Sequence, residues 1–142
     1  MSVTETDFAA VTVVRSPVVH VVEPDPGVAG GLRALLSSHG LQVRLYASAE
    51  EFLAAGEPVS GCVVTEAELP GKSGIELIEA LRRRESALAV VVIAARGDVA
   101  TAVKAMRAGA ADFLEKPFSQ NALIDRVAEL VAQSGNAAGQ RH

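Results

Sequence analysis

The chain has 142 residues, of which 49% are hydrophobic and 21% are charged, a composition that fits one globular domain and excludes disordered, collagen-like and coiled-coil classes. Thirteen Lys and Arg against 17 Asp and Glu give a net charge of -4, which argues against direct binding to nucleic acid. A single cysteine excludes an internal disulfide, and no apolar run approaches the roughly 20 residues of a membrane span. Because no targeting segment is recognisable, we expect a soluble, cytoplasmic protein.

Two weakly patterned segments flank the rest of the chain, residues 1–16 and 134–142. We expect both to be flexible extensions around one domain at residues 17–133.

Short apolar runs alternate with helical patterns along that domain. In chain order, strands are predicted at Pro17–Glu23, Leu41–Tyr46, Val59–Thr65, Leu88–Ala94 and Ala111–Glu115. A helical pattern follows each strand, and the helices are predicted to begin at residues of types that cap helix N-termini, namely Asp25, Ser48, Ser73, Asp98 and Ser119. This alternation predicts an α/β fold with a doubly wound, five-stranded parallel sheet in the order 2-1-3-4-5.

In such a sheet the functional crevice lies at the carboxyl ends of the strands, between strands one and three. The predicted strand ends place a group of acids, one lysine and several neutral residues there: Glu23, Pro24, Asp25, Glu66, Ala94, Ala95 and Lys116.

Five segments of the chain carry motifs at or near these strand ends: Val21–Asp25, Val64–Pro70, Ser73–Leu77, Val92–Asp98 and Ala108–Phe118. Together and in this order they resemble the receiver domain of bacterial response regulators, particularly of the FixJ type. The resemblance covers residues 18–131 and implies a CheY-like, flavodoxin-like fold. It also implies a role in two-component signalling, in which a histidine kinase transfers a phosphoryl group to an Asp after strand three, with Mg²⁺ held by acids after strand one.

The sequence departs from this family pattern at three positions. Glu66 stands where the family has its phosphoaccepting Asp, Pro24 where it has a metal-binding acid, and Ala94 where it has a phosphate-binding Thr or Ser. The extra methylene of Glu66 displaces the carboxylate, and a displacement of about 1 Å can cost on the order of 100-fold in rate. Without a hydroxyl at position 94, nothing draws Phe113, the switch aromatic that the resemblance implies, toward the crevice.

The remaining crevice groups are Glu23, Asp25 and Lys116. We expect Lys116 to pair with Glu66 where a phosphate would otherwise lie, and Asp25 to cap the first helix rather than bind metal. No cofactor is expected. A residual Mg²⁺ site would use Glu23, Asp25, Glu66 and the backbone carbonyl of Glu68, and would be weakened by the carboxylate missing at position 24.

The sequence therefore predicts an atypical single-domain receiver that is not an enzyme and acts through protein–protein interaction, with phosphorylation lost or impaired. Its expected partners are a histidine kinase, another regulator or a second copy of the chain. The resemblance implies two binding faces for them. One is formed by the helix around Val99–Arg107, the fifth strand and the last helix, and is where receivers commonly dimerise; the other is the first helix.

Two alternatives remain open. In one, Glu66 accepts a phosphoryl group and the protein is a working phosphorelay receiver. In the other, Glu66 imitates phosphoaspartate and the regulator is constitutively active. Nucleotide binding by Pro70–Ser73 is disfavoured, because a phosphate-binding loop needs a glycine where Glu66 stands.

Overall fold

The computed structural model describes residues 17–56 and 60–139. In chain order its elements are β1 (Val18–Val22), α2 (Pro26–Ser37), β2 (Gln42–Tyr46), α3 (Ala49–Ala54), β3 (Gly61–Glu66), α4 (Gly74–Arg83), β4 (Ala89–Ala94), α5 (Val99–Ala108), β5 (Asp112–Glu115) and α6 (Gln120–Gly139). The strands form one parallel sheet in the order β2-β1-β3-β4-β5. The predicted topology is confirmed.

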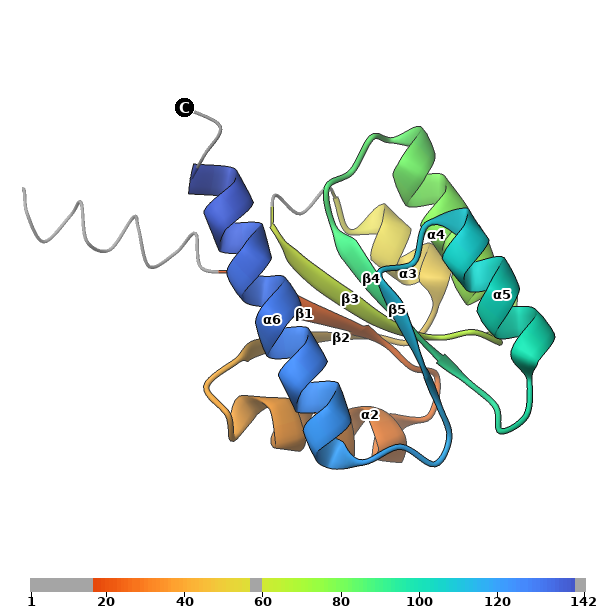
Figure 1. Ribbon diagram of the computed structural model, residues 1–142, viewed down its shortest axis with the longest axis horizontal. Helices are drawn as coiled ribbons and strands as arrows, with labels where there is room; N and C mark the ends of the chain where they lie inside the picture. Colours follow the sequence, from red (N-terminus) through yellow and green to blue (C-terminus); the bar gives the residue numbers. More distant parts are fainter. Residues whose placement is uncertain (1–16, 57–59, 140–142) are drawn as a thin grey trace, which may run out of the picture.

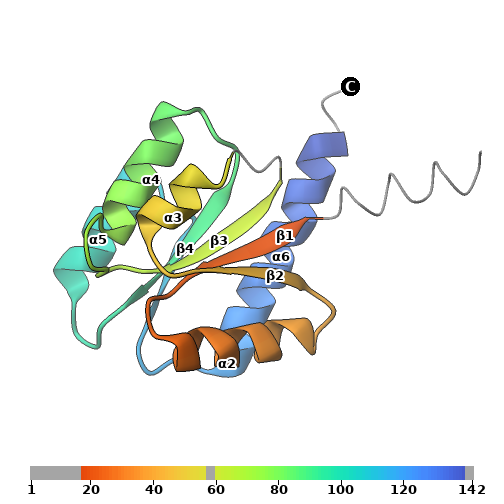
Figure 2. The ribbon, with the colours of Figure 1, turned by 180° about the vertical axis from the view of Figure 1, so that it is seen from behind.

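Helices cover both faces of the sheet. Figures 1 and 2 show α2 and α6 on one face and α3, α4 and α5 on the other. The central strands β1, β3 and β4 carry almost only buried residues, whereas the edge strands β2 and β5 are partly exposed. This pattern follows from the β-branched runs of the central strands, which fit a sheet buried on both sides. Two hydrophobic clusters, one under each helical layer, fix the sheet and therefore the positions of its strand ends.

The helix starts are set by the predicted caps. Side-chain oxygens of five residues accept hydrogen bonds from backbone N–H groups of the first turns: Asp25, Ser48, Ser73, Asp98 and Ser119. Ser73 and Glu76 form a reciprocal capping box at the start of α4. Each such cap typically stabilises a helix by about 1 kcal/mol.

The end of the domain differs from the prediction. Helix α6 continues to Gly139, so the predicted boundary at residue 133 is too early. The apolar periodicity fades after Val131, but no proline follows to stop the helix. The Ser134 hydroxyl accepts a hydrogen bond from the Gly61 N–H at 2.8 Å, which joins α6 to the start of β3. The expected extension at residues 1–16, residues 140–142 and the predicted strand start at Val59 lie outside the described residues.

A buried histidine lies in the core on strand β1. His20 of β1 is only 4% exposed, its Nδ1 lies 3.0 Å from the Tyr46 hydroxyl, and its ring packs edge-on against Phe52. The Nε2 atom has no hydrogen-bond partner among the described residues. Burial, followed by the positive charge of Arg44, lowers the pKa of His20 from 6.5 to about 4, so the ring is neutral at neutral pH.

None of the helices within residues 17–56 and 60–139 combines the length and the apolar character that crossing a membrane requires.

Candidate functional site

The strand ends meet at one edge of the sheet, because parallel strands finish on the same side. There β1 is followed by Glu23, β3 ends at Glu66, β4 ends at Ala94 and β5 is followed by Lys116. This edge is called the crevice below.

An ion pair lies across the crevice. The Lys116 Nζ is 2.9 Å from Glu66 Oε1, with 15% of the Glu66 side chain and 48% of the Lys116 side chain exposed. The backbone N–H of Lys116 donates to the carbonyl oxygen of Ala94 at 2.9 Å, and the peptide bond from Lys116 to Pro117 is cis. Lys116 thus reaches across the end of β4 to the residue that ends β3, as expected.

Glu23 is the most enclosed acid of the crevice, at 7% exposure. Its Oε2 accepts a hydrogen bond from the Asp25 N–H at 3.0 Å. Burial raises the pKa of Glu23; the Asp25 N–H lowers it, the charge and hydrogen bonding of Glu66 raise it, and the charge of Lys116 lowers it. Burial and the neighbouring Glu66 therefore both disfavour the ionised form of Glu23, while Lys116 contacts the Glu66 carboxylate.

Asp25 turns away from this group. Its Oδ1 accepts hydrogen bonds from Gly27 N–H at 2.8 Å and Val28 N–H at 3.2 Å, so it caps α2. The neighbouring Pro24 is exposed and has no side-chain ligand to offer.

The residues present do not fit a Mg²⁺ site of the kind that the resemblance implies. Mg²⁺ requires near-ideal octahedral coordination by oxygen atoms. One Glu66 oxygen is taken by Lys116, one Glu23 oxygen by a backbone N–H, and Asp25 by the helix start. Glu68 is exposed, two residues beyond Glu66. Within the described ranges, no three His, Cys, Asp or Glu side chains are arranged to hold a metal ion.

The loop between β3 and α4 does not form a phosphate cradle. The Lys72 N–H donates to Glu50 Oε2 at 2.8 Å, and a Cβ placed on Gly71 would lie 2.6 Å from the same oxygen. The Ser73 hydroxyl caps α4 instead of facing a ligand. The backbone N–H groups of Lys72 and Ser73 are thus committed to protein contacts.

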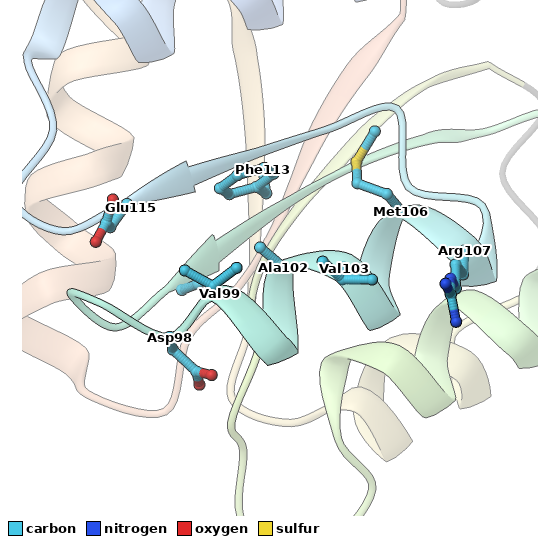
Figure 3. Close-up of a pocket in the computed structure, with 9 residues that line it drawn as sticks. Asp98, Val99, Ala102, Val103, Met106, Arg107, Phe113 and Glu115 are labelled. Carbon is cyan, nitrogen blue, oxygen red and sulfur yellow. The ribbon is translucent and has the colours of Figure 1, made fainter.

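A second feature lies beside the crevice, on the face formed by α5 and β5. It is a largely apolar hollow of about 410 Å³, called the groove below, and Figure 3 shows Phe113 of β5 across from Val99 and Ala102 of α5. Large apolar side chains are exposed here: Val99 by 70%, Val103 by 44%, Met106 by 43% and Phe113 by 37%. The groove is lined by Ala94, Asp98, Val99, Ala102, Val103, Met106, Arg107, Phe113 and Glu115.

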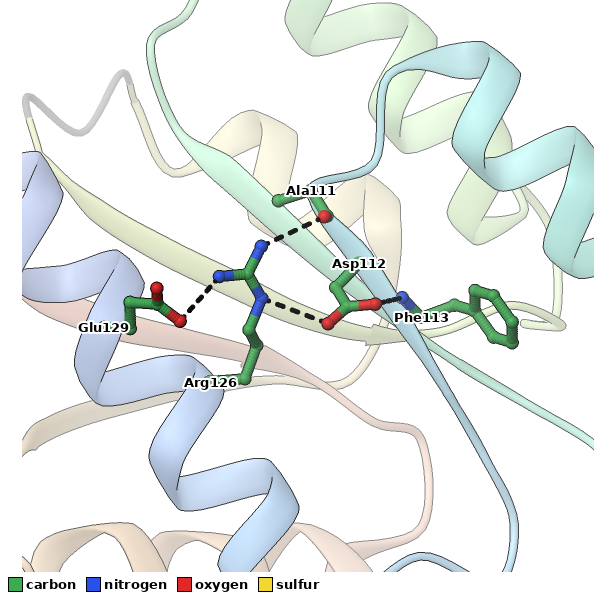
Figure 4. Close-up of polar contacts among 5 residues, drawn as sticks. All are labelled: Ala111, Asp112, Phe113, Arg126 and Glu129. Carbon is green, nitrogen blue, oxygen red and sulfur yellow. Dashed lines mark hydrogen bonds and ion pairs between the residues drawn. The ribbon is translucent and has the colours of Figure 1, made fainter.

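The backbone of β5 beside the groove is held by α6. Arg126 Nε lies 3.0 Å from Asp112 Oδ2, and its Nη2 donates to the Ala111 carbonyl oxygen at 3.3 Å (Figure 4). Asp112 Oδ1 accepts from the Phe113 N–H at 2.8 Å, and Glu129 completes the network through Arg126 Nη1. The guanidinium fork therefore fixes the strand segment that presents Phe113.

The loop between β4 and α5 is attached to β5 by Glu115, whose carboxylate accepts a hydrogen bond from the Gly97 N–H.

Sequence reasoning placed Glu23, Glu66, Ala94 and Lys116 correctly at one edge, because strand ends alone determine that edge. It missed the contacts of Glu115 and Arg126. No local spacing signals them, since their partners depend on how a loop and a helix pack against β5.

Comparisons with known proteins identify the family of the chain. Residues 19–128 match the family model described as response regulator receiver domain. The chain is 46% identical over 123 residues to the transcriptional regulatory protein FixJ of Azorhizobium caulinodans, covering 86% of this chain and 58% of that protein. It is 40% identical over 110 residues to the C4-dicarboxylate transport transcriptional regulatory protein DctD of Pseudomonas aeruginosa, covering 77% of this chain and 24% of that protein.

Solved structures show the same fold. The crystal structure of FixJ-N superposes with a TM-score of 0.73 at 36% identity, over 82% of this chain and 94% of that one. The response regulator StyR gives a TM-score of 0.81 at 38% identity, over 89% of this chain and 64% of that one. The chain spans 54% to 59% of the length of the three curated FixJ relatives.

Proposed function

The chain belongs to the response regulator receiver domain family, and from that premise we propose that it is an atypical receiver that signals by binding other proteins, with phosphoryl transfer lost or impaired. Receiver domains of two-component response regulators are generally not enzymes. The observation that carries the proposal is the ion pair between Glu66 and Lys116. The residue in the phosphoacceptor position is bound to the cation that would neutralise a phosphoryl group.

Two further positions support the loss of chemistry. Pro24 supplies no carboxylate beside Glu23, so we propose that Mg²⁺ is bound weakly and that no cofactor is needed. Ala94 presents a methyl group, which cannot hydrogen-bond a phosphate oxygen. Each departure removes one of the groups that phosphoryl transfer uses for positioning and charge neutralisation.

The proposal is tested by phosphorylation. The full chain is incubated with Mg²⁺ and acetyl phosphate, or with an autophosphorylated histidine kinase, and phosphorylation is measured by intact-protein mass spectrometry. We expect no stable phosphoryl adduct. A variant with Pro24→Asp, Glu66→Asp and Ala94→Thr together serves as the matched gain-of-function control, and is expected to become labelled.

A stable adduct on the wild-type chain that is lost in Glu66→Gln would overturn the proposal in favour of a working phosphorelay receiver. The gain of label by the triple variant, with none on the wild type, would support the assignment of the loss to these three positions.

The protein partner is proposed to bind at the groove. Receiver domains interact with histidine kinases and with effector domains, and an exposed apolar hollow on a small domain marks an interaction surface. We propose a histidine kinase, another regulator or a second copy of the chain as the occupant, and no direct contact with nucleic acid, given the net charge of -4.

Self-association provides a direct test for the second copy. Sedimentation velocity is measured on the wild type and on Val103→Glu, which places a charge in the groove. A concentration-dependent dimer in the wild type that is lost in Val103→Glu supports a second copy as the occupant. A monomer at all concentrations excludes it.

The constitutively active alternative has less support. A single carboxylate carries less charge and fewer oxygens than a phosphoryl group. Phe113, which an active receiver would draw toward the crevice, is 37% exposed over the groove, and Glu66 is paired with Lys116. If Glu66 imitated phosphoaspartate, Glu66→Ala would abolish partner binding. We expect the partner still to bind Glu66→Ala.

A further inference from the structure

Two neighbouring residues at the end of β5 make contacts in different parts of the site. Lys116 contacts Glu66 in the crevice. Glu115 lines the groove and accepts a hydrogen bond from the Gly97 N–H. A single peptide unit therefore joins the charged crevice to the apolar groove.

The Gly97 contact fixes the beginning of α5. Gly97 has a φ of 78°, a left-handed conformation that glycine adopts without penalty, and the next residue, Asp98, caps α5 by accepting from the Thr101 N–H at 3.1 Å. The negative charge of Glu115 thus lies close to the N-terminal end of α5, where the helix dipole favours it. Val99, the most exposed large apolar residue described in the groove, begins this helix.

The end of β4 offers no comparable connection through its side chain. Ala94 presents only a methyl group, and its carbonyl oxygen accepts from the Lys116 N–H. Among the described residues, the one side-chain hydrogen bond shown between the end of β5 and the loop at residues 95–98 is that of Glu115.

We propose that Glu115 is a positioning residue that couples the crevice to the groove. The Glu66–Lys116 pair holds the end of β5 in place. The hydrogen bond from the Gly97 N–H to Glu115 then sets where the first turn of α5 lies, and this turn forms one wall of the groove. The inference rests on the proposed function, in which the groove binds a protein partner, and it deepens that proposal by naming the residue that sets the shape of the binding surface.

The test is a double-mutant cycle on the full chain followed by NMR. Glu66→Ala removes the ion pair and Glu115→Ala removes the loop contact. The readouts are the methyl shifts of Val99 and Val103 and the exchange rate of the Gly97 amide. Glu115→Ala is expected to speed Gly97 exchange about tenfold, as expected for a lost hydrogen bond to a charged acceptor.

The cycle separates coupling from a merely structural role. With Glu115 present, Glu66→Ala is expected to shift the groove methyl signals; with Glu115→Ala already made, adding Glu66→Ala is expected to leave them unchanged. Equal shifts in both backgrounds would overturn the proposal, as would a Gly97 exchange rate unaffected by Glu115→Ala.

Two further variants complete the design. Glu115→Gln keeps an oxygen that accepts the hydrogen bond, so it covers the case in which Glu115→Ala does not fold, and it is expected to preserve part of the coupling. Glu79→Gln changes an exposed acid on α4 and serves as the matched control, with no shift expected. Neither a phosphoryl donor nor a partner is present in these samples. Phosphorylation of Glu66, found in the separate labelling experiment, would overturn the proposed function but would not affect the result of the double-mutant cycle. Equal methyl shifts in the cycle would overturn the coupling through Glu115 but would not affect the proposed function.

Discussion

The crevice and the groove meet at the ends of β4 and β5, but the crevice has paired polar side chains and the groove has exposed apolar ones. In the crevice, Glu66 is 2.9 Å from Lys116 and Glu23 is bonded to a backbone N–H, so the polar groups satisfy one another. In the groove, apolar side chains such as Val99, 70% exposed, face open space. Paired charges leave little for an incoming phosphate, whereas exposed apolar surface gains free energy when a partner covers it. The contrast supports the proposal that a partner binds at the groove, with the crevice as a structural element.

The strongest way to break the crevice is at its backbone. A Cβ on Gly74 would lie 2.4 Å from the Glu66 carbonyl oxygen, so Gly74→Ala must displace the end of β3. We expect it to lower the free energy of unfolding by about 1–3 kcal/mol, as overpacked sites do, measured by urea denaturation. Gly30→Ala on α2 is the matched control, because a Cβ there meets nothing within 4 Å. Equal losses in the two variants would contradict the prediction.

The pH dependence of stability distinguishes the buried His20 of β1 from the acids of the crevice. The folded pKa of His20, about 4, lies below the unfolded value of 6.5, so unfolding takes up a proton. The resulting stability is complete above pH 6.5 and is lost as the pH falls toward 4, by up to about 1.4 kcal/mol per pH unit. In His20→Phe this contribution should be absent, so the difference between the two proteins in thermal unfolding should change across this range. A constant difference between pH 4 and 7 would show that His20 does not titrate in this way.

Glu23 should produce a pH effect of the opposite sign. Burial raises its folded pKa, so its ionisation at neutral pH opposes folding and its contribution improves as the pH falls. Glu23→Gln, which keeps an oxygen for the Asp25 N–H, is expected to raise the unfolding temperature at pH 7 and to lose this advantage in acid. A lower unfolding temperature at pH 7 would mean that attraction to Lys116 outweighs burial.

Removing the lysine should have a modest effect. Lys116→Gln leaves Glu66 without its cation, but the lysine side chain is 48% exposed, so solvent limits the loss in stability to about 1 kcal/mol or less. Urea denaturation at low and high salt tests this, and the difference between variant and wild type should shrink with salt. A loss of several kcal/mol would mean that the crevice is a buried charge cluster rather than a screened pair.

The smallest change in stability is expected in the groove. Val103 is 44% exposed, so Val103→Glu should alter the free energy of unfolding by no more than about 0.5 kcal/mol. The same variant is expected to abolish partner binding. Strong destabilisation by Val103→Glu would show that the groove contributes to the core and would remove the contrast between the two regions.

The sequence was sufficient where local chemistry decides the structure. The strand order and the caps at Asp25 and Ser73 were correct, because buried β-branched runs and capping residues act over a few positions. The approach of Lys116 to Glu66 was also correct, since both follow from strand ends. The sequence could not show the contact of Glu115 with Gly97, 18 positions away, or that of Arg126 with Asp112, 14 positions away. Those contacts depend on helix and loop angles that only tertiary packing determines.

The ion pair has one more consequence under the proposed function. If the crevice acid is held by its own lysine and accepts no phosphoryl group, the receiver does not respond to whether an upstream kinase is phosphorylated. Its output would then scale with the number of copies in the cell, so that synthesis and degradation, rather than a labile acyl phosphate, would set the strength and duration of the response.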